Sequence, residues 1–254
     1  MRIVVAMKAV PDLVEEIELT PDETGIDREY LKFVLNEWDD QALEEALLVK
    51  DATGAEVVAV GLADDPDMEQ ALYTAIAKGA DGAVKLTGGG LDTHARAAAF
   101  AAYLAQEPAD LVITGVQAPD DLDGQLAPML AARLGQRHVS VVVGVTVQDG
   151  NLVVRQEFSG GRSHELQLPT PAVIGLQASR ETPRYAPITR IRQAMQAGGL
   201  QEATVDAGAE ASGLTVRRMY RPEATGHAEM FSGDTEEVAG KIIELLRERG
   251  IVKA

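Results

Sequence analysis

The first 135 residues alternate short apolar runs with segments of helical periodicity. Four runs are continuously apolar rather than alternating, which is typical of strands buried on both faces of a parallel sheet. They cover residues 2–7, 56–62, 82–86 and 110–115. Strand–helix–strand alternation with short links predicts an α/β fold, a Rossmann-like and mostly parallel sheet with helices on both faces. Ligands of such sheets bind beyond the carboxyl ends of the strands.

The helical segments between these runs carry start and stop signals. Asn36 and Asp92 stand where N-caps are wanted, because their side chains can accept hydrogen bonds from the first helical N–H groups. Gly79 and Gly135 stand in C-cap positions. The predicted helices span about 36–50, 65–79, 92–106 and 123–135.

The second half of the chain follows a different pattern. Asp149-Gly150 between two β-rich runs predicts a hairpin, and we expect it and the strands of 163–177 to be antiparallel or edge-like. From residue 198 the composition loosens, which predicts an extended arm to about residue 230. The chain then ends in a helix that starts at Asp234 and carries the apolar stripe Val238, Ile242, Leu245 and Leu246.

These patterns divide the chain into a nucleotide-binding α/β domain, 1–197, and a C-terminal arm with its helix, 198–254. An apolar stripe on the last helix has to be covered. From the pattern alone, two covers are equally expected: a partner chain and the sheet of the same chain.

The charge and composition exclude several classes of protein. A net charge of -17 argues against nucleic-acid binding and against binding to anionic membrane surfaces. The absence of cysteine excludes disulfides, thiolate metal sites and a cysteine nucleophile. The amino terminus runs directly into an apolar strand, and no apolar run is long enough for membrane insertion, so a cytoplasmic location is expected.

A search for catalytic groups finds no nucleophile with a general base. His94, His138, His164 and His227 have no metal-ligand spacing, so neither a catalytic residue nor a metal site is predicted. Lys8 at the end of the first strand could meet an anion, but a solvated lysine is the simpler interpretation. The acidic loop 120–123 has two interpretations, helix capping by Asp120 and Asp121 or cation binding. The chemistry fits a protein that positions a ready-made cofactor.

Several motifs, in order and at similar spacing, resemble the beta subunit of electron-transfer flavoproteins over nearly the whole chain. They are VAMKAVPD (5–12), LNEWDDQALEEALLVKDATG (35–54), AIAKGADGAVKL (75–86), ADLVITGVQAPDD (109–121), TPRYAPI (182–188) and FSGDTEEVAGKIIELLRERGIV (231–252). Each motif alone is weak, whereas their order and spacing together are specific.

This resemblance implies a non-catalytic electron carrier. The expected molecule is a heterodimer with an alpha subunit, which shares one FAD with this chain and passes electrons from dehydrogenases to an acceptor such as a quinone reductase. The sheet of the beta subunit binds an adenine nucleotide at its switch point. This nucleotide is AMP in ordinary members of the family and a second FAD in electron-bifurcating ones. The resemblance implies that residues 177–185 dock onto dehydrogenases. It assigns cofactor binding to Ala6, Asn36, Trp38, Val60, Asp121, Gly124, Gln125 and Leu126.

The chain departs from the family pattern at the expected phosphate loop. Ordinary members have Asn-Gln-Thr where this chain has Gly124-Gln125-Leu126, which leaves backbone N–H groups at a helix N-terminus to hold phosphate. Arg96 replaces a small hydroxyl residue, and Leu13 stands where some members have an aromatic residue near the flavin. AMP and a second FAD both remain open, as do a stand-alone nucleotide-binding module and an adenylate-using enzyme as alternative functions.

Overall fold

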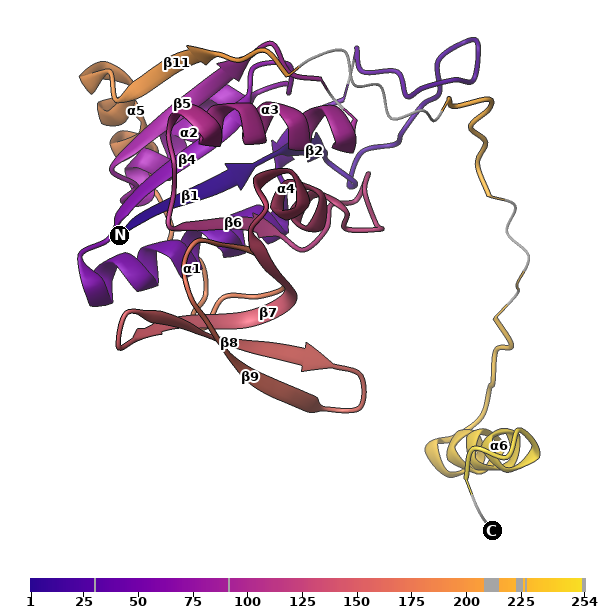
Figure 1. The fold of residues 1–254 in the computed structure, drawn as a ribbon. Helices are drawn as coiled ribbons and strands as arrows, with labels where there is room; N and C mark the ends of the chain where they lie inside the picture. Colours follow the sequence, from indigo (N-terminus) through magenta and orange to yellow (C-terminus); the bar gives the residue numbers. More distant parts are fainter. Residues whose placement is uncertain (30, 91, 208–214, 223–225, 227, 253–254) are drawn as a thin grey trace.

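The computed structural model describes residues 1–252 except 30, 91, 208–214, 223–225 and 227. Within these residues, nine strands form one sheet in the order β11-β5-β4-β1-β6-β10-β7-β8-β9, and β2 and β3 form a small antiparallel ribbon (Figure 1). The strands are β1 (Arg2–Met7), β2 (Ala9–Pro11), β3 (Phe33–Leu35), β4 (Glu56–Leu62), β5 (Gly82–Thr87), β6 (Leu111–Gly115), β7 (Arg137–Gln148), β8 (Asn151–Phe158), β9 (Arg162–Leu168), β10 (Ala172–Leu176) and β11 (Leu200–Thr204).

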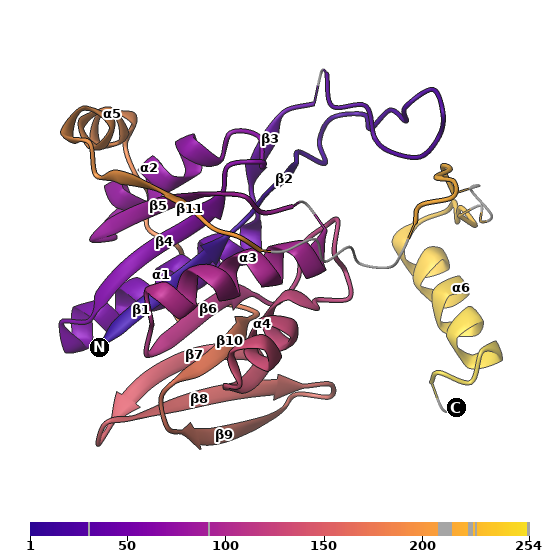
Figure 2. The same cartoon turned by 45° about the horizontal axis from the view of Figure 1, so that its top comes forward.

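Helices cover both faces of the sheet, as predicted (Figure 2). Successive side chains of a strand point to opposite faces. Ile3, Val5 and Met7 of β1 therefore join one core with α1 and α2, while Val4 and Ala6 join a second core with α3 and α4. The helices are α1 (Glu37–Thr53), α2 (Met68–Lys78), α3 (Thr93–Gln106), α4 (Leu126–Leu134), α5 (Ile188–Ala197), which packs against α2, and α6 (Thr235–Glu248).

Most of the predicted helix caps are confirmed. The Asp92 carboxylate accepts hydrogen bonds from the N–H groups of His94 and Ala95, and the chain leaves α2 and α4 at Gly79 and Gly135. The cap predicted at Asn36 is wrong. Asn36 occupies the N-cap position of α1, but its side chain turns away and donates from Nδ2 to the Gln117 carbonyl oxygen at 2.9 Å.

The predicted hairpin is confirmed, but two strands lie elsewhere than expected. Asp149 and Gly150, at φ 49° and 79°, connect β7 to its antiparallel partner β8. However, β10 is neither antiparallel nor at an edge: all five of its residues are buried, and it lies between β6 and β7, parallel to both. β11, in the range expected to be an extended arm, pairs in parallel with β5.

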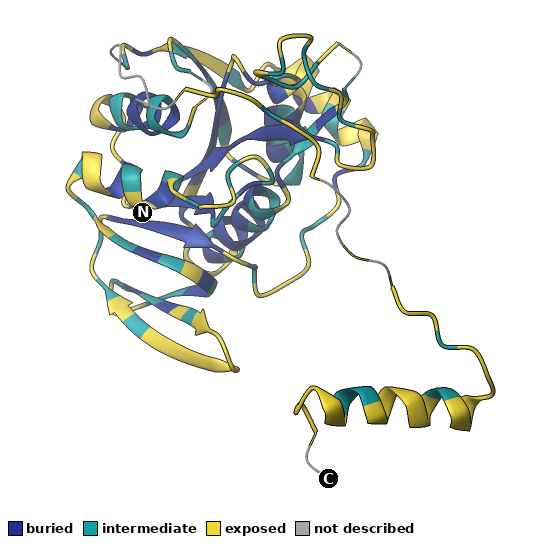
Figure 3. Ribbon diagram, turned by 90° about the vertical axis from the view of Figure 1, so that its right-hand side faces the viewer, coloured by how far each residue is buried: buried dark blue, intermediate teal, exposed yellow. Residues whose placement is uncertain are grey.

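The last helix stands away from the sheet (Figure 3). Asp234 caps α6 as predicted, by accepting from the N–H groups of Glu236 and Glu237. No residue of α6 is buried, so its apolar stripe does not pack on the sheet of its own chain. The preceding segment touches the 12–31 loop, where Arg218 contacts Glu23 and Arg221 contacts Glu16. Residues 208–214, 223–225 and 227 of the predicted arm lie outside the described residues.

Candidate functional site

A small pocket lies where the strand order reverses. From β1 the chain runs outward through β4 and β5, and then returns to β6 on the other side of β1. The loops that follow these carboxyl ends meet there, as expected for the ligand crevice of an open α/β sheet. The pocket is lined by Lys8, Asn36, Asp39, Thr93, Arg96, Gly115, Val116, Gln117, Ala118, Asp121, Gly124 and Leu126.

Lys8, directly after β1, is not the solvated lysine that the sequence favoured. It is only 7% exposed, and its Nζ lies 2.5 Å from the Asp120 carboxylate. Asp120 belongs to the acidic loop, and it remains about half exposed on its outer side. The ion pair therefore ties that loop to the end of the central strand.

Arg96 in the first turn of α3 forms the second ion pair of the pocket. Its two terminal nitrogens donate to the two oxygens of Asp65 at 2.7 and 2.5 Å, and both side chains are almost fully buried. Two charges out of water stabilise a fold only when they remain paired. Asp65 comes from the loop after β4, so the pair joins the β4 loop to the start of α3.

Asp39 in the first turn of α1 joins the ends of two neighbouring strands. Its carboxylate accepts from the backbone N–H groups of Lys8 at 2.9 Å and Gly115 at 2.8 Å. Burial raises the pKa of Asp39 to about 7, while these N–H groups act in the opposite direction. Asp39 was not predicted as a site residue, since an acid in the first turn of a helix is usually explained by the helix dipole alone.

The acidic loop is shaped by one glycine rather than by capping aspartates. Gly124 has φ 62°, and a Cβ atom there would lie 2.3 Å from the Val116 carbonyl oxygen. The N-cap position of α4 belongs to Gln125, whose side chain makes no capping bond. The capping interpretation of Asp120 and Asp121 is therefore wrong: Asp120 binds Lys8, and Asp121 accepts from the Thr93 hydroxyl at 3.2 Å.

The residues assigned by resemblance fall into two groups. Asn36, Asp121, Gly124 and Leu126 line the pocket. Ala6 and Val60 are buried in the neighbouring core as adjacent partners of β1 and β4, Trp38 is half-buried against Gly115, and Gln125 is exposed. Lys8, Asp39, Thr93, Arg96 and residues 115–118 also line the pocket without having been assigned to it. Two of them had given a signal in the sequence: Arg96 as a departure from the family pattern, and Lys8 as a strand-end lysine that could meet an anion.

The donor and acceptor chemistry of this pocket fits a phosphorylated ligand. Asn36 Oδ1 and Arg96 Nε are buried and make no hydrogen bond within the described residues, although buried polar atoms are normally paired. Two buried cations and the uncapped N-terminal turn of α4 supply groups that bind anions. The enclosed volume is about 20 Å³, room for about one water molecule. A nucleotide therefore fits the chemistry of the wall, but it requires side chains of the wall to move.

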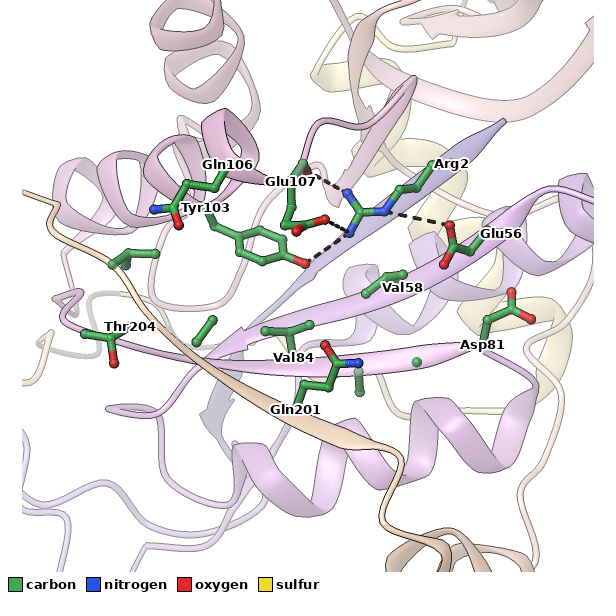
Figure 4. A pocket seen from close by; sticks show the side chains of 14 residues that line it. Arg2, Glu56, Val58, Asp81, Val84, Tyr103, Gln106, Glu107, Gln201 and Thr204 are labelled. Atoms are coloured by element: carbon green, nitrogen blue, oxygen red, sulfur yellow. Dashed lines mark hydrogen bonds and ion pairs between the residues drawn. The ribbon is translucent and has the colours of Figure 1, made fainter.

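A larger cavity, of about 540 Å³, lies at the amino ends of the strands between β11 and α3. Figure 4 shows Arg2 at its edge, where the guanidinium contacts Tyr103, Glu107 and Glu56. Its wall holds one cation, Arg2, and three acids, Glu56, Asp81 and Glu107, whereas the wall of the smaller pocket has as many cations as acids. A phosphorylated ligand is therefore favoured at the smaller switch-point pocket, despite the difference in volume.

Among the described residues, which exclude His227, no three His, Asp or Glu side chains are placed to hold a metal ion. In the same residues, no helix is both long and apolar enough to cross a membrane.

Comparison with known proteins agrees with this architecture. A family model described as "Electron transfer flavoprotein domain" matches residues 24–208. The chain belongs to the electron transfer flavoprotein family. It is 33% identical to the electron transfer flavoprotein subunit beta of Methylophilus methylotrophus, with 98% of each chain covered, and 31% identical to that of Clostridium acetobutylicum, again with 98% of each covered.

A third relative carries a different name. The caffeyl-CoA reductase-Etf complex subunit CarD of Acetobacterium woodii is 31% identical, over 99% of this chain and 100% of that protein. Similarity along the whole length places the chain among the electron transfer flavoprotein beta subunits, which are electron carriers rather than catalytic enzymes. Membership of this family implies association with a flavin.

Proposed function

We propose that the chain is one half of a heterodimeric electron transfer flavoprotein and holds an adenine nucleotide at its switch-point pocket. The observation that carries this proposal is the pocket wall itself, where buried Lys8 and Arg96 face the same small cavity as the orphaned Asn36 Oδ1. Asn36, Asp121, Gly124 and Leu126 would contact the nucleotide directly. Ala6, Val60 and Gln125 would form the floor and rim around them.

The proposed partner is an alpha subunit that holds most of one FAD. The exposed apolar stripe of α6 supports a partner chain, since exposed apolar stripes mark interaction surfaces. In this arrangement residues 1–197 form the nucleotide-binding domain, to whose sheet β11 adds an edge strand, and the rest of 198–254 is the part that contacts the alpha subunit. Trp38 would approach the flavin, which supplies the redox chemistry when bound, whereas this chain orients it and excludes water.

Residues 177–185 are the proposed docking segment for dehydrogenases. The segment is anchored along α1: the Ser179 N–H donates to Gln41, Arg180 donates to Glu45, and Arg184 donates to Glu44. At its end, the Tyr185 side chain is 80% exposed. A rigid segment with an exposed aromatic residue suits a docking surface, because less entropy is lost on binding.

Two nucleotide contents are compatible with the proposal. One AMP beside the shared FAD is the content of a simple carrier, and a second FAD in place of AMP is the content of a bifurcating one. The decisive experiment is co-expression with an alpha-type chain, followed by release and chromatography of the bound nucleotides. One FAD with one AMP per heterodimer supports simple transfer, and two FADs support the bifurcating form. A heterodimer with one FAD and no further adenine nucleotide would contradict the proposed pocket.

The subunit contact has its own test. Changing Ile242 and Leu245 to Asp places charges on the stripe of α6, and we expect the heterodimer to dissociate in size-exclusion chromatography. The matched control is Glu244→Gln on the same helix, since this residue is exposed and lies outside the predicted stripe. An unchanged heterodimer in the double variant would remove α6 from the interface.

A further inference from the structure

We infer that Arg96 selects phosphorylated ligands at the switch-point pocket, and that Asp65 acts as an internal competitor for its guanidinium. The inference rests on the proposed adenylate site and adds a specificity-determining pair to it. Both residues are buried: Arg96 lines the cavity from the first turn of α3, and Asp65, in the loop after β4, engages its guanidinium through two parallel hydrogen bonds.

Arg96 has the geometry that phosphate binding requires. A guanidinium has five N–H donors in a planar fork, which matches a phosphate as well as a carboxylate. Asp65 occupies two of these donors, and Nε remains buried without a partner. Because Arg96 lies in the first turn of α3, a phosphate bound to it would also lie near the positive end of that helix dipole, beside the Asp92 carboxylate that caps the N–H groups of His94 and Ala95.

Asp65 mimics the ligand while the pocket is closed. A buried guanidinium without a counter-charge is strongly destabilising, so an acid has to hold it when no anion is present. A phosphate that enters the pocket supplies the same counter-charge and repels the Asp65 carboxylate. Release from Asp65 would also leave the Arg96 side chain, which lines the cavity of about 20 Å³, able to move and widen it. Phosphorylated ligands would therefore open the pocket, whereas a neutral nucleoside has nothing to offer Arg96.

The test compares the binding of AMP and adenosine to the full chain in complex with its alpha-type partner. The adenine nucleotide of the switch-point pocket is removed beforehand. Affinities are measured by calorimetry for the wild type, Arg96→Met, Arg96→Lys and Asp65→Asn. A charge-assisted hydrogen bond lost in Arg96→Met should weaken AMP binding by about ten- to a hundredfold. Adenosine binding should change by no more than about twofold, the size expected where no such bond is lost. Asp65→Asn should strengthen AMP binding by about tenfold, since the competing charge is gone.

A second readout covers variants that fold less well. Asp65→Asn leaves Arg96 without a counter-charge, so its melting temperature should fall, and AMP should restore it by more than it raises that of the wild type. Arg96→Lys keeps the charge without the fork, and its AMP affinity should lie between those of the wild type and Arg96→Met. Lys78→Met is the control: it breaks a partly buried pair with Asp40 on α1, neither residue of which lines the pocket, and should leave AMP affinity unchanged.

Equal weakening of AMP and adenosine in Arg96→Met would overturn the inference, because Arg96 would then only shape the cavity. Unchanged or weaker AMP binding in Asp65→Asn would overturn the role of Asp65 as competitor. These results leave the proposed function standing as long as the wild type binds AMP. Failure of the wild-type heterodimer to bind either ligand would instead contradict the proposed adenylate site itself.

Discussion

Two ion pairs with a buried carboxylate, Glu45–Arg180 and Asp65–Arg96, differ in how completely their buried polar atoms are satisfied. On α1, Glu45 is fully buried and accepts from the N–H of Val145, the N–H of Arg180 and Nε of Arg180. At the switch point, Arg96 meets Asp65 alone, and its Nε stays unpaired. A buried polar group with all its hydrogen bonds made stabilises one structure, whereas a group with an unpaired atom can gain a hydrogen bond by changing its partner. Glu45 with its donors in Val145 and Arg180 is therefore a structural clamp, whereas Arg96 with Asp65 belongs to a pocket that can still bind a ligand.

The largest expected effect is on the clamp. Glu45→Ala leaves the buried N–H of Val145 and the partly buried N–H of Arg180 without an acceptor and removes the charge-assisted bond to Arg180 Nε, so we expect a loss of about 3–5 kcal/mol of unfolding free energy. Urea denaturation of the full chain measures it. The control is Glu181→Ala, an exposed acid in the anchored segment, which should cost less than about 0.5 kcal/mol. A loss at Glu45 no greater than at Glu181 would mean that the clamp does not stabilise the fold.

The second prediction concerns the pH dependence of stability that comes from Asp39, a residue of the pocket wall. The pKa of Asp39 is raised from 3.8 to about 7, so between these values the folded state binds more protons than the unfolded state. Its contribution to stability is therefore complete below about pH 3.8 and is lost as the pH rises through 7, by at most about 4 kcal/mol.

Asp39→Asn tests this titration. The difference in unfolding free energy between the wild type and the variant should fall from pH 5 to pH 8 and become flat above that range. A difference that is constant across these pH values would show that Asp39 is charged throughout. The measurement also separates Asp39 from the clamp, because Glu44 and Glu45 are present in both proteins.

The third prediction tests the shape of the acidic loop. Gly124→Ala combines a positive φ with a Cβ atom 2.3 Å from a carbonyl oxygen, so we expect a loss of about 2–3 kcal/mol. Gly135→Ala is the matched control, since its φ is 63° but no atom lies within 4 Å of the added Cβ. It should lose about 1 kcal/mol, from backbone strain alone. Thermal unfolding of both variants gives the difference, and equal losses would show that the loop yields to the added methyl group.

The sequence predicted the elements that depend on local signals and not those that depend on tertiary packing. Continuous apolar runs identified β1, β4, β5 and β6, and Asp149-Gly150 identified the hairpin, because these signals are local. β10 was misplaced because five apolar residues do not reveal which strands they pair with. β11 was missed because LQEAT is an edge strand with polar, mostly exposed side chains. Parallel pairing is decided by tertiary packing, which periodicity does not contain.

The candidate site was predictable only in part for a related reason. The position of the loop 116–125 follows from the strand before it and the helix after it. The resemblance of the chain to a known family named four of the pocket residues. Lys8 and Asp120 are 112 positions apart, and Arg96 and Asp65 are 31 apart. Neither spacing corresponds to a helix or strand repeat. Acids such as Glu44 and Glu45 likewise look solvated until the segment that covers them is known.

The smallest expected effect distinguishes two acids of the same loop. Asp121 is half-buried, lines the pocket and accepts from Thr93, whereas Asp123 is exposed. Asp121→Ala should therefore weaken AMP retention by a few fold, about 1 kcal/mol, through the lost hydrogen bond, while Asp123→Ala should not. AMP retained per heterodimer after dialysis measures both. Equal retention in the two variants would show that the acidic loop does not contribute to AMP binding. Asp120 belongs to the same loop, so the evidence for a ligand-binding pocket would then come from Arg96 and Asp65 alone.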